Sequence, residues 1–196
     1  MFVAHHLILS AYGFWLPNDP RGSGSSFVGS DSLYGIAGRA TKVEDGRSRA
    51  HDTHDRTARL AAKAALKNRP VLFTGVQARA IGRRISAHAE QAAIPIWACA
   101  IMPDHAHFVV AECGRDLDKI MLQFKAAATR QLLAEEIHPF QGQSPVPKCF
   151  AQGGWKVFLK AETVERTIRY VEENPIKAGL PAQKWRFVRR ETNVES

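Results

Sequence analysis

The sequence predicts an α+β fold in which an antiparallel sheet is covered by helices on one face. Two β-prone runs, IPIWACAIM and HAHFVVAEC, are separated only by Pro-Asp, a turn signal that favours an antiparallel hairpin. Other segments are rich in alanine and have helical periodicity. With 196 residues, the chain is long enough to bury one hydrophobic core. Helices mixed with antiparallel strands in this way are typical of the α+β class.

The first half of the chain is expected to contain a strand, a long loop and two helices. The strand covers about residues 5–12, and the loop, at about 17–55, is rich in Gly, Ser, Asp and Arg without a sustained period. RTARLAAKAALKNRP then reads as a helix that ends at a proline. The next helix, TGVQARAIGRRISAHAEQAA, has Thr74 as its expected N-cap.

The second half continues from the hairpin with two helices and two short strands. RDLDKIMLQFKAAATRQLLAEE has helical periodicity, and WKVFL is expected to form a short strand. AETVERTIRYVEENP is expected to be a helix that stops by Pro175. WRFVRR is expected to form a last short strand. We expect residues 1–196 to form a single domain with the long loop as an insertion.

Charge and cysteine usage indicate a cytoplasmic protein that meets polyanions. Lys and Arg number 27 against 19 Asp and Glu, which gives a net charge of +8 and favours nucleic acid as a partner. Cys99, Cys113 and Cys149 are widely spaced, which argues against a disulfide scaffold or a zinc ribbon. No run approaches the roughly 20 apolar residues of a membrane span, and we expect no signal peptide. The expected location is the cytoplasm, with the nucleoid when DNA is bound.

Two histidines occupy alternate positions of the run IMPDHAHFVV. Because side chains alternate along a strand, His105 and His107 are expected on one face of the sheet, and Ala106 and Phe108 on the other. Two neighbouring imidazoles on a strand are close enough to share one divalent ion. Asp104, just before them, is expected in the turn, where an acidic group can also tune a metal. The spacing alone fits two structural histidines equally, and that alternative stays open.

The last long helix carries Tyr170 and Asn174 one turn apart and off its apolar stripe. That stripe consists of Val164, Ile168 and Val171, which fall within about 60° at 100° per residue. Tyr170 is therefore not explained as a core aromatic. A tyrosine hydroxyl can act as a covalent nucleophile, and an asparagine amide oxygen one turn away is a reasonable ligand for a hard metal ion.

With both motifs in view, the chain resembles the HUH single-tyrosine transposases. MPDHAHFVV resembles their histidine–hydrophobic–histidine motif, and YVEENPIKAGL resembles their nucleophile helix. YGFWLPNDPRG is similar to the N-terminal segment of REP-associated tyrosine transposases, which are relatives of the insertion-sequence transposases. LQFKAAATRQL and GGWKVFL are similar to the central helix of that group and to the strand before its nucleophile helix. The resemblance covers most of the chain.

The resemblance implies an enzyme that cuts and rejoins single-stranded DNA beside hairpin or palindromic elements with a divalent metal, Mg²⁺ or Mn²⁺. Tyr170 would attack the scissile phosphate, form a 5′-phosphotyrosine link and release a 3′-hydroxyl. His105, His107 and Asn174 would be the metal ligands. The family fold is a ferredoxin-like or RRM-like sheet, in line with the α+β prediction. Insertion-sequence relatives are dimers whereas a monomer fits the REP-associated members, so a homodimer and a monomer both stay open.

Five further residues are candidates for contact with DNA. Trp15 offers a base-stacking surface and Arg21 a phosphate contact in the long loop. Lys125 and Arg130 lie on the helix that runs near the active site in the family, and they can meet phosphates. Arg166, one turn before the nucleophile, can favour its ionised form. The alternatives are a loop anchor for the tryptophan and ordinary solvated charges for the basic residues.

Two other functions stay open at this stage. A non-cleaving protein that binds single-stranded DNA or RNA fits the same fold, because RRM-like sheets bind single strands readily. A replication or conjugation initiator would share the chemistry. It is disfavoured because these 196 residues leave no room for a helicase-sized second domain.

Overall fold

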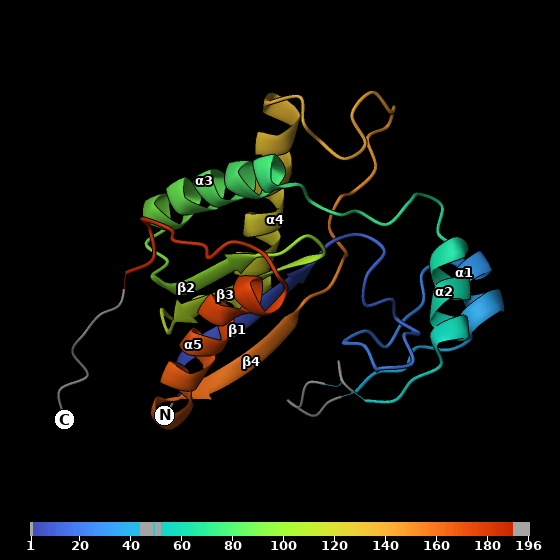
Figure 1. Ribbon diagram of the computed structural model, residues 1–196, viewed down its shortest axis with the longest axis horizontal. Coiled ribbons are helices and arrows are strands. Elements are labelled where there is room, and N and C mark those ends of the chain that lie inside the picture. Colours follow the sequence, from blue (N-terminus) through green and yellow to red (C-terminus); the bar gives the residue numbers. More distant parts are fainter. Residues whose placement is uncertain (1, 44–48, 50–51, 190–196) are drawn as a thin grey trace.

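A computed structural model describes residues 2–43, 49 and 52–189. Within these residues the chain forms four strands and five helices, which confirms the predicted α+β class (Figure 1). In chain order the elements are β1 (Phe2–Ser10), α1 (Asp31–Ala37), α2 (Arg56–Ala64), α3 (Gly75–Gln91), β2 (Ile96–Ile101), β3 (His105–Ala111), α4 (Leu117–Ala134), β4 (Trp155–Lys160) and α5 (Ala161–Lys177).

The four strands form one antiparallel sheet in the order β2-β3-β1-β4. β2 and β3 are the predicted hairpin, and the Met102 N–H donates to the His105 carbonyl at 2.8 Å across its turn. β1 pairs with β3 so that Ile8 lies opposite His107 and Ser10 opposite His105. β4 pairs on the other side of β1. The two strands that carry histidines are therefore the central pair.

Helices pack on both faces of this sheet. α3 and α4 cover one face, where Leu7 and Phe108 belong to the larger core cluster. α5 covers the opposite face, where Ile168 and Val171 pack with Val109. The sequence-based expectation of helices on one face describes α3 and α4 but not α5. The physical reason is that every residue of β3 after the first is buried, so both faces of the central strands need an apolar cover.

Local signals explain where α3 begins, but one prediction for the end of α5 is wrong. Thr74 is the N-cap of α3 as predicted, in a capping box in which Thr74 and Gln77 each accept the other's backbone N–H. α5 runs to Lys177 rather than stopping before Pro175. Pro175 is buried in the last turn, where its missing N–H removes only one helical hydrogen bond.

The segment after α5 covers the free edge of β2 instead of forming the predicted last strand. The side chain of Gln183 imitates a paired strand there, because it accepts from the Ile101 N–H and donates to the Ile101 carbonyl, both at 2.8 Å. Trp185 packs so closely on Gly82 of α3 that a Cβ at that glycine would lie 2.1 Å from the ring. The predicted strand fails because its tryptophan anchors the segment to a helix; its last residue lies outside the described residues.

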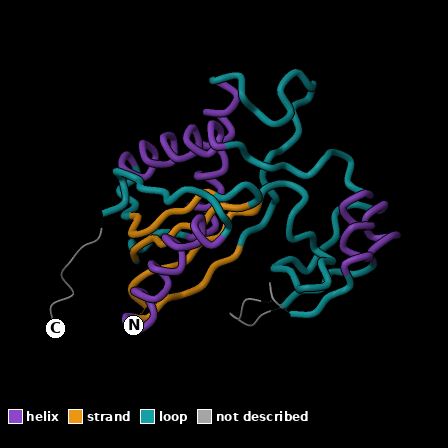
Figure 2. The backbone as a smooth tube through the Cα atoms, in the orientation of Figure 1, coloured by secondary structure: helices purple, strands orange, loops and turns teal. Residues whose placement is uncertain are grey.

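The long loop and the helix after it form a small unit set apart from the sheet (Figure 2). α1 and α2 pack around Leu33 and Ala62 in a separate apolar cluster. The unit follows β1 in the chain and therefore leaves the sheet at the end of β1 where Ser10 faces the first residue of β3. Residues 44–48 and 50–51 of the predicted loop lie outside the described residues.

Candidate functional site

Three histidines from neighbouring strands meet on the α5 face of the sheet. His105 and His107 share one face of β3 as predicted, and their Nε2 atoms are 2.8 Å apart. His6 of β1 extends the group, with its Nε2 2.9 Å from Nδ1 of His107. The rings of His6 and His107 are stacked with centroids 5.0 Å apart. The imidazoles thus form a continuous chain across β1 and β3.

Tyr170 of α5 closes this group from above the sheet. Its ring is edge-on to His107, with centroids 5.8 Å apart, and to His6, with centroids 6.2 Å apart. The side chain is 43% exposed, whereas Ile168 and Val171 of the apolar stripe are buried. This confirms that Tyr170 lies off the stripe. The tyrosine therefore contacts the imidazoles on one side and remains open to solvent on another.

Hydrogen bonds restrict which nitrogen of each imidazole carries a proton. Nδ1 of His105 lies 2.7 Å from a carboxylate oxygen of Asp104, which only accepts, so this nitrogen donates and Nε2 keeps its lone pair. His107 has two arrangements. A proton on its Nε2 is donated to His105, whereas a proton on its Nδ1 is donated to His6. In the second arrangement two Nε2 lone pairs are left 2.8 Å apart and are available to one metal ion.

Burial favours the neutral form of His6 and His107. Burial and then the charge of His105 lower the pKa of His6 to about 4. Burial, followed by the charges of His105 and His6, lowers the pKa of His107 well below its usual value. Burial raises the pKa of Asp104, but the hydrogen bond and charge of His105, with a smaller effect of Lys63, outweigh it and leave that pKa lowered. At neutral pH His6 and His107 are therefore uncharged, and the Asp104 carboxylate is ionised.

These residues fit a divalent ion. Two nitrogens about 2.1 Å from one ion and about 90° apart lie about 3 Å from each other, which is close to the observed 2.8 Å. Asp104 and His6 hold the outer nitrogens of the pair, as hydrogen-bond partners commonly do for metal-bound histidine. In the part of the chain that the structure describes, no three His, Cys, Asp or Glu side chains converge on one ion.

Asn174 is the residue predicted as the third metal ligand. It lies one turn beyond Tyr170 on α5, whose ring contacts two of the imidazoles. Its amide Nδ2 is buried and finds no hydrogen-bond partner among the described residues. Because an amide can exchange its oxygen and nitrogen by rotation, the same buried position also suits an oxygen that binds a cation. The role of Asn174 as a metal ligand stays a prediction.

The basic residues predicted to bind DNA on the helices lie in two different places. Arg166 is exposed, one turn before Tyr170. Lys125 and Arg130 belong to α4, on the opposite face of the sheet from the histidines. The Lys125 ammonium donates to the carbonyls of residues 151–153 at 2.8, 3.2 and 2.6 Å. With its three N–H groups occupied, Lys125 holds the segment before β4 and has none left for a phosphate.

Trp15 and Arg21 hold each other within the insertion. The Arg21 guanidinium lies 4.1 Å from the centre of the Trp15 ring. It also donates twice to the Asp19 carboxylate, at 2.9 and 3.0 Å. Asp19 is buried, so this group anchors the loop, which is the alternative that the sequence leaves open. Contact of either residue with DNA stays a prediction.

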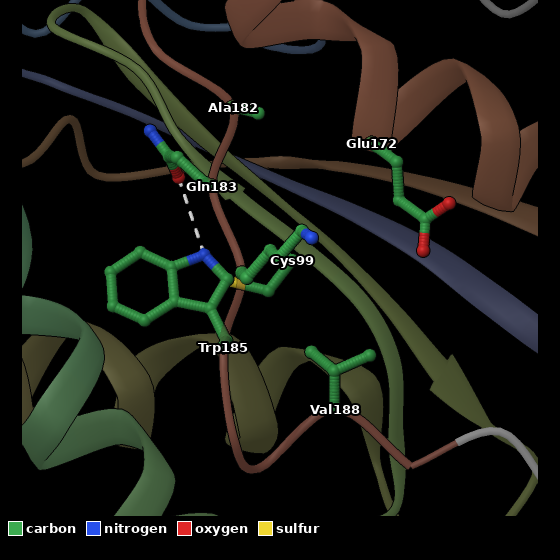
Figure 3. Close-up of a pocket in the computed structure, with 7 residues that line it drawn as sticks. Cys99, Glu172, Ala182, Gln183, Trp185 and Val188 are labelled. Carbon is green, nitrogen blue, oxygen red and sulfur yellow. Dashed lines mark hydrogen bonds between the residues drawn. The ribbon is translucent and has the colours of Figure 1, made fainter.

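A hollow beside α5 is separate from the histidines. Its lining includes Cys99 of β2, Glu172 of α5 and Trp185 of the C-terminal segment (Figure 3). Glu172 lies about 200° around the helix from Tyr170, since each residue turns about 100°. Burial raises the pKa of Cys99 well above its usual range, so this thiol stays protonated and unreactive. The hollow is formed where the C-terminal segment packs along the edge of β2.

His6 is the site residue that the sequence analysis missed. It is one of two adjacent histidines that project to opposite faces of β1, and its neighbour His5 pairs at 2.5 Å with Glu112. Alternation places His6 and Ile8 on one face. Only the pairing of Ile8 with His107 brings His6 beside the predicted pair, and no local pattern encodes that register.

Comparison with known proteins identifies relatives of the chain. The family model described as "Transposase IS200 like" matches residues 63–174, a span that includes the histidine pair and Tyr170 and ends at Asn174. No curated protein matches the sequence. Two solved structures are similar. A REP-associated tyrosine transposase bound to a REP hairpin shares 17% identity with a TM-score of 0.45, over 59% of this chain and 65% of its own. A candidate transposase from Deinococcus radiodurans R1 shares 11% identity with a TM-score of 0.43, over 93% of this chain and 94% of its own.

Proposed function

The chain belongs to the IS200-like transposase family, and we propose that it cuts and rejoins single-stranded DNA through a 5′-phosphotyrosine intermediate on Tyr170. One observation carries this proposal. The exposed ring of Tyr170 contacts an imidazole group in which the Nε2 atoms of His105 and His107 lie 2.8 Å apart. The proposed nucleophile therefore lies beside the proposed metal-binding pair, with its side chain open to solvent. Hairpin or palindromic elements beside the cleavage site complete the proposed substrate.

The proposed reaction exchanges one phosphodiester bond for another. The Tyr170 oxygen attacks the scissile phosphorus, and the bond from phosphorus to the 3′ oxygen breaks. The 5′ phosphate remains on the tyrosine, the 3′ oxygen takes up a proton, and the phenol proton passes to solvent. Rejoining is the reverse, with a 3′-hydroxyl attacking the phosphotyrosine. Arg166, exposed one turn before Tyr170, is available to contact the strand.

The side chains around the nucleophile orient the phosphate and each other. His105, His107 and Asn174 would hold Mg²⁺ or Mn²⁺, which when bound polarises the phosphate and stabilises negative charge. Two imidazole ligands favour Mn²⁺ over Mg²⁺, because Mg²⁺ prefers oxygen donors and binds lower in the affinity series. Asp104 and His6 fix the ring orientation of the two histidines through their Nδ1 atoms.

The expected partner is single-stranded DNA, and one chain forms the whole proposed site. Tyr170 contacts histidines of its own chain, so the chemistry we propose does not require a second subunit even if a homodimer forms. A net charge of +8 favours binding to the DNA backbone. No helix in the described ranges is long and apolar enough to cross a membrane. We propose that the protein acts on DNA in the cytoplasm.

Covalent trapping on a labelled hairpin with single-stranded flanks tests the proposal. With Mn²⁺ present, the wild-type protein should form an adduct that survives denaturation, and Tyr170→Phe should form none. Tyr34→Phe is the matched control because Tyr34 is 50% exposed, against 43% for Tyr170, and lies in the insertion. It should form as much adduct as wild type.

Two results would overturn the nuclease assignment. One is the absence of any adduct from the wild-type protein, and the other is an equal adduct from Tyr170→Phe. Tight binding of the strand that persists in EDTA without cleavage would instead indicate a non-cleaving single-strand binding protein.

A further inference from the structure

The Lys63 side chain of helix α2 extends from the unit beside the sheet toward the turn that precedes the histidine pair. The Ala11 N–H donates to the Asp104 carbonyl at 2.8 Å, which ties the chain leaving β1 to that turn. Three residues later, the ring of Phe14 lies 4.0 Å from the ammonium of Lys63 on α2. The charges of Lys63 and Asp104 are close enough to interact. The ammonium of Lys63 therefore lies near the turn beside the proposed active site.

Arg59 and Lys63 are two cations of α2 that form no salt bridge among the described residues, although the charges of nearby acids act on both. They are four residues apart and so share one side of the helix. Within the described part of the chain, neither side chain forms a salt bridge, and the guanidinium Nε of Arg59 is buried without a hydrogen-bond partner. Leaving a buried charged donor unpaired is costly. An acceptor supplied by a ligand would remove that cost.

The acidic residues nearby are already engaged. Asp19 is bound by Arg21 through two hydrogen bonds, and Asp104 bonds to the first histidine of the pair. Burial, and then the charges of Arg59 and Arg21, lower the pKa of Lys63 in spite of the opposing charges of Asp104 and Asp19. Positive charge is thus in excess beside the site, and it favours an anion.

We propose that Arg59 and Lys63 form a seat for one phosphodiester of the bound DNA strand, beside the turn of Asp104 and His105. This inference rests on the proposed function and deepens it. A phosphodiester has one negative charge and several acceptor oxygens, which suit a guanidinium and an ammonium on adjacent turns. Phe14 supports the ammonium through its ring. The insertion between β1 and α3 then serves to place the strand at the histidine end of the sheet.

Neutralising one phosphate at a time tests the seat. A labelled hairpin with single-stranded flanks carries one methylphosphonate, moved along the flanks, and binding is measured by fluorescence anisotropy in EDTA to prevent cleavage. At one position the wild-type Kd should rise about tenfold, the size expected for a charge-assisted hydrogen bond. In the R59Q/K63Q variant, a methylphosphonate at the same position should change Kd less than about twofold, because the cations that bind this phosphate are already absent.

A charge-matched double variant separates a specific seat from general attraction. R56Q/K67Q removes the same two charges at exposed positions flanking the pair. It should keep the tenfold effect at the same phosphate. R59Q/K63Q should also reduce the slope of log K against log salt by about 0.7, the value for one single-strand phosphate. Circular dichroism checks that each variant is folded, and K63Q alone replaces the double variant if it is not.

The seat is overturned if no backbone position shows this coupling, or if R56Q/K67Q loses it to the same extent. Because the scan measures binding without cleavage, its failure leaves the Tyr170 adduct result intact. Conversely, absence of the adduct would refute the proposed chemistry without altering the scan.

Discussion

The two faces of one sheet show how the same strands serve stability and chemistry. On the face covered by α3 and α4, β1 and β3 contribute apolar side chains such as Leu7 and Phe108, both fully buried. On the α5 face, Val109 belongs to a smaller apolar cluster. His6 and His107 lie beside this cluster on the same face and form a polar group. Because side chains alternate, a polar site can occupy one face while the other stays dry.

The largest difference between the faces should appear in stability. Phe108→Ala should lower the free energy of unfolding by about 3–5 kcal/mol, because it opens a cavity in the larger core. Tyr170→Phe should change it by less than about 0.5 kcal/mol, because this side chain is largely exposed. Urea denaturation followed by circular dichroism measures both. Equal losses in the two variants would contradict the division of roles.

A pH effect of intermediate size should come from His6 on the histidine face. Folding lowers the pKa of His6 from 6.5 to about 4, so the unfolded chain binds this proton more readily than the folded chain. The stability that the neutral imidazole contributes is complete above pH 6.5 and is lost as pH falls toward 4, by about 3 kcal/mol. Unfolding free energies in EDTA between pH 7 and 4 measure it.

Two variants isolate that pH effect. His6→Gln should lack this part of the pH dependence, because glutamine does not titrate there. Phe108→Ala should lose the same amount of stability at every pH, because phenylalanine does not titrate. A wild-type slope unchanged in His6→Gln would refute the buried neutral imidazole.

A smaller effect is expected on metal affinity, which should depend on His6 but not on its neighbour His5 in β1. His6→Leu removes the hydrogen-bond partner of the His107 Nδ1 atom and should weaken Mn²⁺ binding about 10- to 100-fold. His6→Gln keeps an acceptor oxygen and should lose less than about threefold. His5→Leu, on the opposite face, should have no effect. Titration of free Mn²⁺ by electron paramagnetic resonance gives the three values, and equal losses at both histidines would refute the role of His6.

The smallest effect should show that α4 supports the fold rather than the DNA. Lys125→Met removes three hydrogen bonds to carbonyls and should lower the free energy of unfolding by about 1–2 kcal/mol. Its affinity for the hairpin strand should stay within about twofold of wild type. A tenfold loss of DNA affinity in the folded variant would restore Lys125 as a phosphate contact.

Much of the fold follows from local sequence patterns. The Pro-Asp turn predicts the β2–β3 hairpin, and Thr74 predicts the start of α3 through a capping box. Long-range pairings are less accessible. The placement of α5 on the second face depends on how both faces of β3 are filled, and the C-terminal segment follows the packing of Trp185 on Gly82. Neither arrangement leaves a periodic signal in the sequence.

The site divides in the same way. The shared face of His105 and His107, and the position of Tyr170 off the apolar stripe, could be predicted because strand alternation and helix periodicity are local. His6 could not, because it joins the group only through the register of β1 against β3. The structural role of Lys125 also depends on a distant segment, residues 151–153, that folds over its ammonium.

The most direct test of the account is to identify which residue carries the DNA. The trapped adduct is digested with protease and nuclease, and the modified peptide is identified by mass spectrometry. The account predicts a phosphorylated nucleotide remnant, joined through its 5′ phosphate, on the peptide that contains Tyr170. A remnant on Tyr12, Tyr34 or a serine, or a link through a 3′ phosphate, would contradict the assignment of the α5 face as the catalytic face.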